Sequence, residues 1–166
     1  MYKTKLIILL KSLHKKELKK FESYISTPFF NTKKPCIELF NILNSLYPDF
    51  SEKDIDRVVI FRKMFLQKKF QYNKLRYVMS DLTKLLEDFL AYCEYEKNTV
   101  QVNPFLLKAY ANKNINNHFE QTFSQQQKTL EEMFLRDDSF FFQQFTIEKE
   151  RYNFNDLHDN HTKFDV

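Results

Sequence analysis

The 166-residue chain contains no glycine, although the usual frequency of about 7% would supply about a dozen. Glycine is the residue that adopts positive φ angles at little energetic cost. Phosphate-binding loops, dinucleotide-binding turns, nucleophile elbows and EF-hand loops require it, and tight β-hairpins and strand bulges commonly use it. The sequence therefore predicts an all-α fold and disfavours each of these glycine-dependent sites.

The composition is typical of a folded chain rather than a disordered one. Hydrophobic residues make up 43% and aromatic residues 17% of the sequence, including 19 phenylalanines, so a bulky core is expected. Lysine outnumbers arginine by 21 to 5, and only 3 alanines are present. A/T-rich codon usage produces the same bias, so the abundance of lysine is by itself weak grounds for a functional role.

Apolar side chains recur every three or four residues along most of the chain, which is the period of an amphipathic helix. The clearest helix is expected from Asn73 to about Glu96, because Leu75, Leu82 and Phe89 lie seven residues apart within it. Shorter apolar stripes predict four earlier helices, with these residues on their inward faces: Leu6, Leu9, Leu10 and Leu13; Leu18, Phe21 and Ile25; Ile37, Phe40 and Leu43; Ile55, Val59 and Phe65.

Polar residues and prolines indicate where these helices begin and end. Pro28 and Pro48 are expected to stop helices, whereas Pro35 and Pro104 suit a first helical turn. Two segments carry a cap residue, an acid three residues later and two flanking apolar residues placed as a hydrophobic staple. These are His14 with Glu17 between Leu13 and Leu18, and Ser51 with Asp54 between Phe50 and Ile55; Asn73 is a further expected cap.

The C-terminal part predicts two long helices joined by a short polar link. The first carries Ile115, Phe119, Phe123, Leu130 and Met133 or Phe134, and the second carries Phe141, Phe142, Phe145 and Tyr152. The link over residues 136–139 offers an aspartate as a cap. So short a link makes the helices an antiparallel αα-hairpin, the unit from which helical solenoids are built. No second copy at a spacing of about 34 residues is found.

The stretch from Lys97 to Asn103 has no periodic pattern and is the best candidate boundary. We therefore expect a basic helical bundle over residues 1–97, an αα-hairpin region packed on it over residues 104–154 and a polar tail over residues 155–166. A single domain overall is the alternative, since the length suits one.

Five motifs resemble those of a family of uncharacterised bacterial all-helical proteins. They are LLKSL at 9–13, KKELKKFE at 15–22, TPFFN at 27–31, YPDF at 47–50 and KLRYVMSDL at 74–82. The resemblance covers about the first 95 residues, with a weaker likeness from Ser139 to Phe154. It implies a helical N-terminal region followed by further helices, and it implies no activity, cofactor or catalytic residue.

Charge is distributed unevenly along the chain. Residues 1–80 hold 17 Lys and Arg against 7 Asp and Glu, a net charge of +10, whereas residues 81–166 hold 9 against 15, a net charge of −6. A basic half with aromatics beside the cations is typical of nucleic-acid binding, for which Lys68, Lys69, Lys74 and Arg76 are the candidate contacts. A solvated lysine-rich surface and packing against an acidic half are the alternatives.

No pattern in the sequence predicts an enzyme, a metal site or a cofactor. His158 and His161 lie three residues apart, but the Glu-x-x-His pattern of a di-iron helix bundle is absent. Cys36 and Cys93 match neither a zinc spacing nor a disulfide framework, and they are expected as small core residues in a reducing compartment. We therefore expect no catalytic, cofactor-binding or metal-binding residues and no small-molecule substrate.

The apolar run from Leu6 to Leu10 is only five residues long, which is too short for a signal peptide or a membrane span. We expect a cytoplasmic protein with no membrane partner.

Three consecutive phenylalanines, Phe140, Phe141 and Phe142, are the remaining outlier. Consecutive residues cannot all face one side of a helix, so at least one ring points away from the local core. Either further helices cover that ring or the three residues form a patch that binds a partner. The sequence favours a non-enzymatic helical protein–protein interaction or scaffold module that binds another protein or a second copy of itself. A nucleic-acid-binding domain is the alternative.

Overall fold

The computed structural model describes residues 1–51, 53–65, 69–97 and 103–161, with side chains as far as residue 157 apart from that of residue 97. Within these ranges the chain forms eight helices and no strand, which confirms the all-α fold. The chain divides into two compact units, residues 1–97 and residues 98–166, and each has its own hydrophobic cluster. The two units are described separately.

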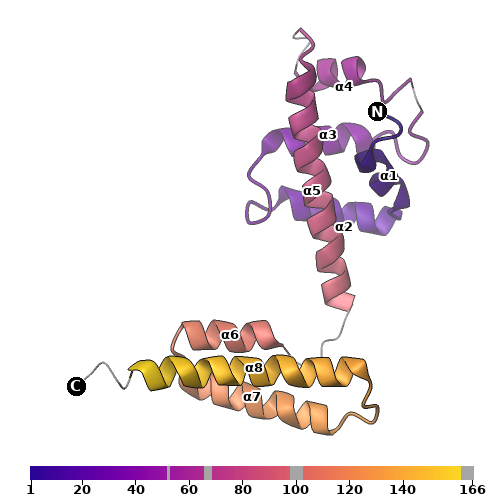
Figure 1. Ribbon diagram of the computed structural model, residues 1–166. Coiled ribbons are helices and arrows are strands. Elements are labelled where there is room, and N and C mark those ends of the chain that lie inside the picture. Colours follow the sequence, from indigo (N-terminus) through magenta and orange to yellow (C-terminus); the bar gives the residue numbers. More distant parts are fainter. Residues whose placement is uncertain (52, 66–68, 98–102, 162–166) are drawn as a thin grey trace. The chain divides into compact units, whose positions relative to one another are not determined.

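The N-terminal unit is built around one long helix (Figure 1). Helix α5 packs against α1, α2 and α3, while α3 also contacts α2 and α4. The bounds are α1 Lys5–Ser12, α2 Lys15–Ser26, α3 Lys34–Asn44, α4 Arg57–Met64 and α5 Tyr72–Lys97. Long-range contacts of α5 with three earlier helices make it the central element of this unit.

The core of this unit contains the predicted face of α5. Leu75, Leu82 and Phe89 are buried as expected. The ring of Phe21 on α2 lies 5.2 Å from that of Phe89 and 5.1 Å from that of Phe40 on α3 (centroid distances). Aromatic contacts of this kind add to the stabilisation from apolar burial, so the phenylalanines join three helices at one point.

The predicted start of α2 is confirmed, and that of α4 is wrong. His14 has extended backbone, its N–H donates to the Glu17 carboxylate at 2.8 Å, and Leu13 and Leu18 are both buried. Helix α4 instead begins after Asp56, whose carboxylate accepts from Val58 N and Val59 N at 2.8 and 3.1 Å.

Ser51 and Asp54 form a local turn that precedes α4. The Ser51 hydroxyl donates to the Asp54 carboxylate at 2.5 Å and accepts from Asp54 N at 3.2 Å. The later start turns Val59 toward solvent, while Ile60 and Phe61 take the buried positions. Asn73 is likewise not a cap, because α5 already begins at Tyr72.

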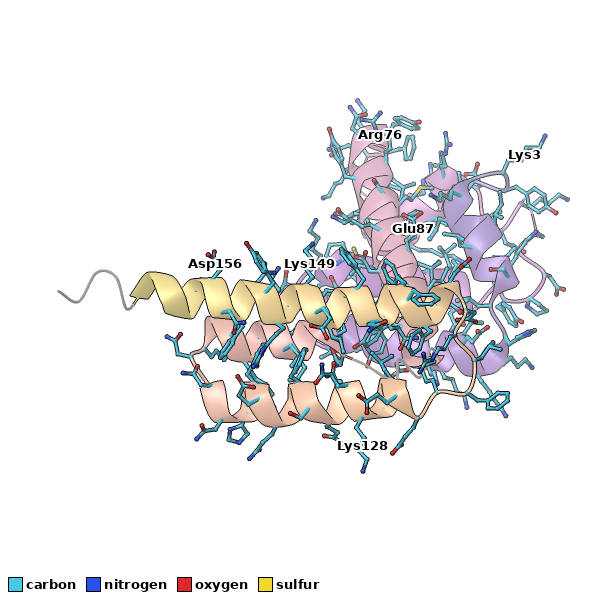
Figure 2. All side chains as sticks on the ribbon, turned by 60° about the horizontal axis from the view of Figure 1, so that its bottom comes forward. Lys3, Arg76, Glu87, Lys128, Lys149 and Asp156 are labelled. Atoms are coloured by element: carbon cyan, nitrogen blue, oxygen red, sulfur yellow. The ribbon has the colours of Figure 1, made fainter. Side chains whose placement is uncertain are left out.

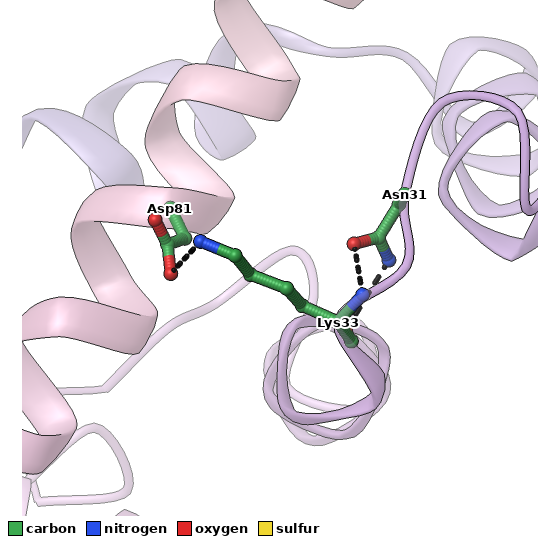
Figure 3. Close-up of polar contacts among 3 residues, drawn as sticks. All are labelled: Asn31, Lys33 and Asp81. Atoms are coloured by element: carbon green, nitrogen blue, oxygen red, sulfur yellow. Dashed lines mark hydrogen bonds and ion pairs between the residues drawn. The ribbon is translucent and has the colours of Figure 1, made fainter.

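The connection between α2 and α3 is fixed by the asparagine of the TPFFN motif (Figure 3). Asn31 is buried; its amide donates to Ile25 O at 2.9 Å, and its side-chain oxygen accepts from Lys33 N at 2.9 Å. The Lys33 ammonium then reaches Asp81 on α5 at 2.8 Å. Side-chain bonds to the backbone thereby order a turn that lacks glycine.

In the part of the chain that the structure describes, two residues adopt positive φ angles, where glycine would be the usual choice. Asn114 has φ 55° and follows α6. The N–H of Ile115 donates to Tyr110 O at 3.0 Å and that of Asn114 to Ala111 O at 3.1 Å, the bond pattern of a Schellman C-cap with asparagine in the glycine position. The other is Phe50, with φ 43° and a fully buried ring.

The C-terminal unit is a three-helix assembly in which every pair of helices is in contact. Its helices are α6 Pro104–Asn112, α7 Asn116–Glu131 and α8 Asp138–His161 (Figure 1). Asn103 caps α6 through Leu106 N at 3.1 Å, and Asp137 caps α8 through Phe140 N at 3.0 Å. The predicted hairpin is thus formed by α7 and α8, and α6 packs against both of these helices.

Two boundaries in this unit differ from expectation. Helix α7 ends at Glu131, so Phe134 lies beyond it and is fully exposed. Helix α8 continues to His161, so residues 155–161 are helical rather than part of a polar tail.

Candidate functional site on the outer face of α8

Helix α8 is apolar on two opposite sides. Its buried stripe consists of Phe140, Ile147 and Phe154, which lie seven residues apart. At 100° per residue, Phe141, Phe145 and Tyr152 lie on the far side of the helix. An ordinary surface helix has a polar face opposite its buried stripe, so this second apolar face is the most unusual surface of the unit.

The side chains of this second face are largely exposed. The exposed fractions are 57% for Phe141, 69% for Phe142, 64% for Phe145 and 72% for Tyr152. Lys149 on the same helix projects away from α7 (Figure 2). We call Phe141, Phe142, Phe145 and Tyr152 the outer aromatic face.

The predicted patch is thus placed differently from expectation. Phe140 is buried in the core and contacts the ring of Phe141 edge-on at 5.3 Å, so it does not belong to the surface. Phe145 and Tyr152, which the sequence placed on an inward stripe, are exposed instead. The seven-residue repeat of Phe140, Ile147 and Phe154 is the sequence signal for the inward face. The larger number of aromatic residues on the opposite side of α8 makes this repeat hard to recognise.

A groove between α7 and α8 borders the outer aromatic face. It is lined by Leu130 from α7, by Arg136 from the link and by Phe141, Gln144 and Glu148 from α8. The Glu148 carboxylate accepts from the side chain of Gln127 at 3.1 Å, which joins the two walls. The exposed rings therefore continue into a concave surface with charged groups along it.

A second candidate surface involves the cations predicted to bind nucleic acid, and the structure does not bring these cations together on one face. Lys68 lies outside the described residues, and Lys69 is exposed. The Lys74 ammonium lies 4.1 Å from the centre of the Phe65 ring, and the Arg76 guanidinium lies 5.4 Å from that of Tyr77.

Sequence reasoning missed a cation that lies near Arg76. Arg57, at the start of α4, lies over Tyr72 at 5.2 Å and lines a pocket with Arg76. Among the described residues, none of Arg57, Lys74 and Arg76 forms an ion pair with a carboxylate. Arg57 follows the Asp56 cap, so recognising the correct start of α4 would have brought it to attention.

The shifted pKa values of Cys36, Lys33 and Tyr92 have structural causes, namely burial and single hydrogen bonds. Burial raises the pKa of the Cys36 thiol to about 11. A hydrogen bond to Asp81 raises the pKa of Lys33, and a hydrogen bond to Glu96 raises that of Tyr92. No three metal-ligating side chains come together within the described ranges. Helices long and apolar enough to cross a membrane are likewise absent from them.

Comparison of the chain with protein-family models, with curated proteins and with solved structures finds no match.

Proposed function

We propose that this chain is a non-enzymatic helical module that binds another protein through the outer aromatic face of α8. The observation that supports this proposal most strongly is the placement of four aromatic side chains, each more than half exposed, on the side of α8 opposite its buried stripe. Exposed apolar patches of this kind commonly mark interaction surfaces, and aromatic rings supply much of the binding energy at protein interfaces.

Exposed phenylalanines also occur outside α8, at Phe29, Phe105 and Phe134, but on α8 four exposed aromatic rings share one side of the helix. Biased codon usage would raise the number of phenylalanines everywhere, yet Phe21, Phe40, Phe61 and Phe119 are essentially fully buried. Each exposed ring forgoes the free energy that burial of an aromatic side chain would supply, about 1.5–3 kcal/mol. Because four such rings lie on one side of α8, a partner that covers this side would gain the burial free energy of all of them.

Affinity capture with a matched control tests the proposal. The tagged chain and its Phe145→Lys/Tyr152→Lys variant are used as baits in an extract of the source cells. Phe29→Lys is the control, because Phe29 is an exposed aromatic in the other unit. We expect the same specific proteins with the wild type and the control and their loss with the double variant. Equal recovery by all three baits would contradict the proposal.

A second candidate function, nucleic-acid binding, is favoured by Arg57 and Arg76, which line one pocket together with Tyr72. Both cations lie on aromatic rings and neither has a carboxylate partner within the described ranges, and rings beside cations are typical of surfaces that bind single strands. Phosphate contacts make such binding weaken steeply with salt.

A salt titration with a labelled single-stranded RNA tests this candidate. Arg57→Ala/Arg76→Ala is the test variant, and Lys108→Ala, at an exposed lysine of the C-terminal unit, is the control. Binding that is lost in the double variant supports it. Absence of binding at about 50 mM salt rejects it, since phosphate contacts are strongest at low salt.

A further inference from the structure

We infer that the pocket lined by Arg57 and Arg76 binds the phosphate monoester of a nucleotide, either at the end of an RNA strand or on a free nucleotide. The inference rests on the second candidate function, nucleic-acid binding, because it takes the same two cations as the binding residues. It adds the chemical group that is bound, a role for Thr4 and the restriction to a terminal phosphate.

The pocket lies in the N-terminal unit, at a place where three helices begin. Thr4 immediately precedes α1, Arg57 is the first residue of α4 and Tyr72 is the first residue of α5. Figure 2 shows Arg76 near this end of α5. Helix N-termini carry a partial positive charge, which adds to the charge of the two guanidinium groups. The side chains that line the pocket are those of Thr4, Arg57, Tyr72, Leu75, Arg76 and Met79.

Both arginines are available to an anion. Neither forms an ion pair with a carboxylate in the part of the chain that the structure describes. Asp56, next to Arg57 in the sequence, accepts from two backbone N–H groups of α4 and does not line the pocket. A phosphate monoester carries a charge of about −1.5 to −2 near neutral pH, whereas a phosphate inside a strand carries about −1. Two unpaired guanidinium groups therefore match a terminal phosphate better than an internal one.

The hydroxyl of Thr4 is a further group that the fold leaves without a partner. Its oxygen is buried, and no described residue forms a hydrogen bond with it. Thr4 stands at the N-cap of α1, yet its side chain does not cap the helix, although threonine commonly does so. A buried hydroxyl without a hydrogen bond is unfavourable. A phosphate oxygen in the pocket would accept a hydrogen bond from this hydroxyl.

The size of the pocket and the ring of Tyr72 favour a nucleotide. The pocket has a volume of about 140 Å³, which is below the roughly 300–1,000 Å³ of sites that enclose a whole small molecule. The pocket therefore encloses only the phosphate end of the ligand. The Tyr72 ring is 48% exposed, with the Arg57 guanidinium 5.2 Å from its centre. This ring offers a surface on which the base of the same nucleotide can stack.

Calorimetric titration of the chain with RNA tests the phosphate site. The ligands are single strands of about ten nucleotides, identical except for a phosphate at the 5′ end, at the 3′ end or at neither. The titration is done at about 50 mM salt, because phosphate contacts are strong there. We expect a terminal phosphate to tighten binding at least about tenfold, through hydrogen bonds to charged groups. Equal affinity for all three RNAs would overturn the inference.

Arginine variants with a matched lysine control locate the site. Arg57→Ala and Arg76→Ala should each abolish the preference for the phosphorylated RNA. Lys74→Ala removes the same charge from α5, but at about 100° per residue Lys74 lies on the side of the helix opposite Arg76, over the ring of Phe65. It should keep the preference. None of the three side chains is buried, so circular dichroism should show an intact fold. A preference that survives both arginine variants, or that the control also loses, would contradict the site.

Thr4→Val tests the buried hydroxyl, since it keeps the shape of the side chain. We expect the melting temperature to stay the same or to rise, because an apolar group replaces an unpaired polar one. Binding of the phosphorylated RNA should weaken by about threefold or more, because the hydroxyl no longer donates to the phosphate. Unchanged affinity would remove Thr4 from the site.

Adenosine 5′-monophosphate and a phosphoserine peptide identify the class of ligand. We expect the monophosphate to displace the phosphorylated RNA, because it carries both a phosphate monoester and a base. Affinity equal to that of the RNA indicates a free nucleotide as the ligand, and weaker affinity indicates the end of a strand. A phosphoserine peptide that competes as well as the monophosphate would overturn the assignment to nucleotides, because it has no base to stack on Tyr72.

The outcomes separate the phosphate site from the second candidate function. Equal binding of RNA with and without a terminal phosphate refutes the phosphate site and leaves nucleic-acid binding standing. Binding of the monophosphate without binding of any RNA supports the site and refutes nucleic-acid binding. Binding of neither ligand refutes both.

Discussion

The rings of Phe119 on α7 and Phe154 on α8 are stacked, with centroids 3.9 Å apart and planes 6° from parallel. Both residues are nearly or fully buried, so the pair joins the two long helices of the C-terminal unit. We predict that Phe154→Ala lowers the free energy of unfolding of this unit by about 3–5 kcal/mol, through lost burial and the cavity left behind. Urea unfolding followed by circular dichroism measures the change.

Phe145→Ala is the matched control for Phe154→Ala. Its ring is 64% exposed on the same helix, so we expect a change of no more than about 0.5 kcal/mol at a concentration where the chain is monomeric. If Phe145→Ala were as damaging as Phe154→Ala, the assignment of inward and outward faces of α8 would be wrong.

The N-cap of α4 makes a second prediction. Asp56→Ala removes two hydrogen bonds to backbone N–H groups and should cost about 1 kcal/mol. Asp54→Ala breaks only the turn with Ser51, which is exposed, and should cost about half as much or less. Thermal unfolding of the two variants compares their stabilities. A larger loss for Asp54→Ala than for Asp56→Ala would favour the predicted cap at Ser51 and Asp54 over Asp56.

The asparagine after α6 makes a third prediction. Asn114 holds φ 55° at the position after the C-cap of α6, where glycine carries no steric penalty and alanine does. Asn114→Gly should leave stability unchanged or raise it by a few tenths of a kcal/mol, whereas Asn114→Ala should lower it by about 1 kcal/mol. Chemical unfolding that finds alanine equal to glycine would argue against the left-handed conformation.

The buried thiol of Cys36 makes a fourth prediction, on pH dependence. Burial raises its pKa from 9.0 to about 11, so the unfolded chain loses this proton at lower pH than the folded chain. The stabilisation from the neutral thiol is complete below pH 9 and is lost as the pH rises toward 11. Between these pH values the free energy of unfolding should fall more steeply for the wild type than for Cys36→Ala.

Reaction with a thiol reagent gives an independent check of that burial. Cys36 is buried and Cys93 is half-buried, so at pH 8 Cys93 should react first, while Cys36 should react at the rate of unfolding. Cys93→Ser and Cys36→Ser variants assign the two phases, and rapid modification of Cys36 in the folded chain would contradict its position in the core.

The sequence predicts the helices of the N-terminal unit well where caps and periodicity agree. At α2 the His14 cap with Glu17, the Leu13 and Leu18 pair and the inward stripe all indicate the same start. At α4 the predicted cap, Ser51 with Asp54 three residues later, and the observed cap, Asp56, lie five residues apart. The start at Asp56 goes with burial of Ile60 and Phe61. Burial of these two side chains depends on contacts with other helices, which helix periodicity within one segment does not reveal.

The surface of α8 was harder to predict for a related reason. Helical periodicity identifies an inward face only when the opposite face is polar, and α8 has apolar residues on both. The sequence pattern favours the stripe with more aromatics as the inward face, whereas the stripe that contains Ile147 is the one in the hydrophobic cluster with residues of α6 and α7. A face that binds a partner and a face that builds the core have the same pattern in a single sequence.

Phe50 combines two requirements that no common side chain meets together. Its backbone has φ 43°, where glycine is favoured, and its ring is fully buried beside Tyr47. Glycine would relieve the backbone and delete the ring, while leucine or isoleucine would keep apolar volume and the unfavourable φ. In a saturation scan, position 50 should therefore tolerate fewer substitutions than equally buried helical positions such as Leu82.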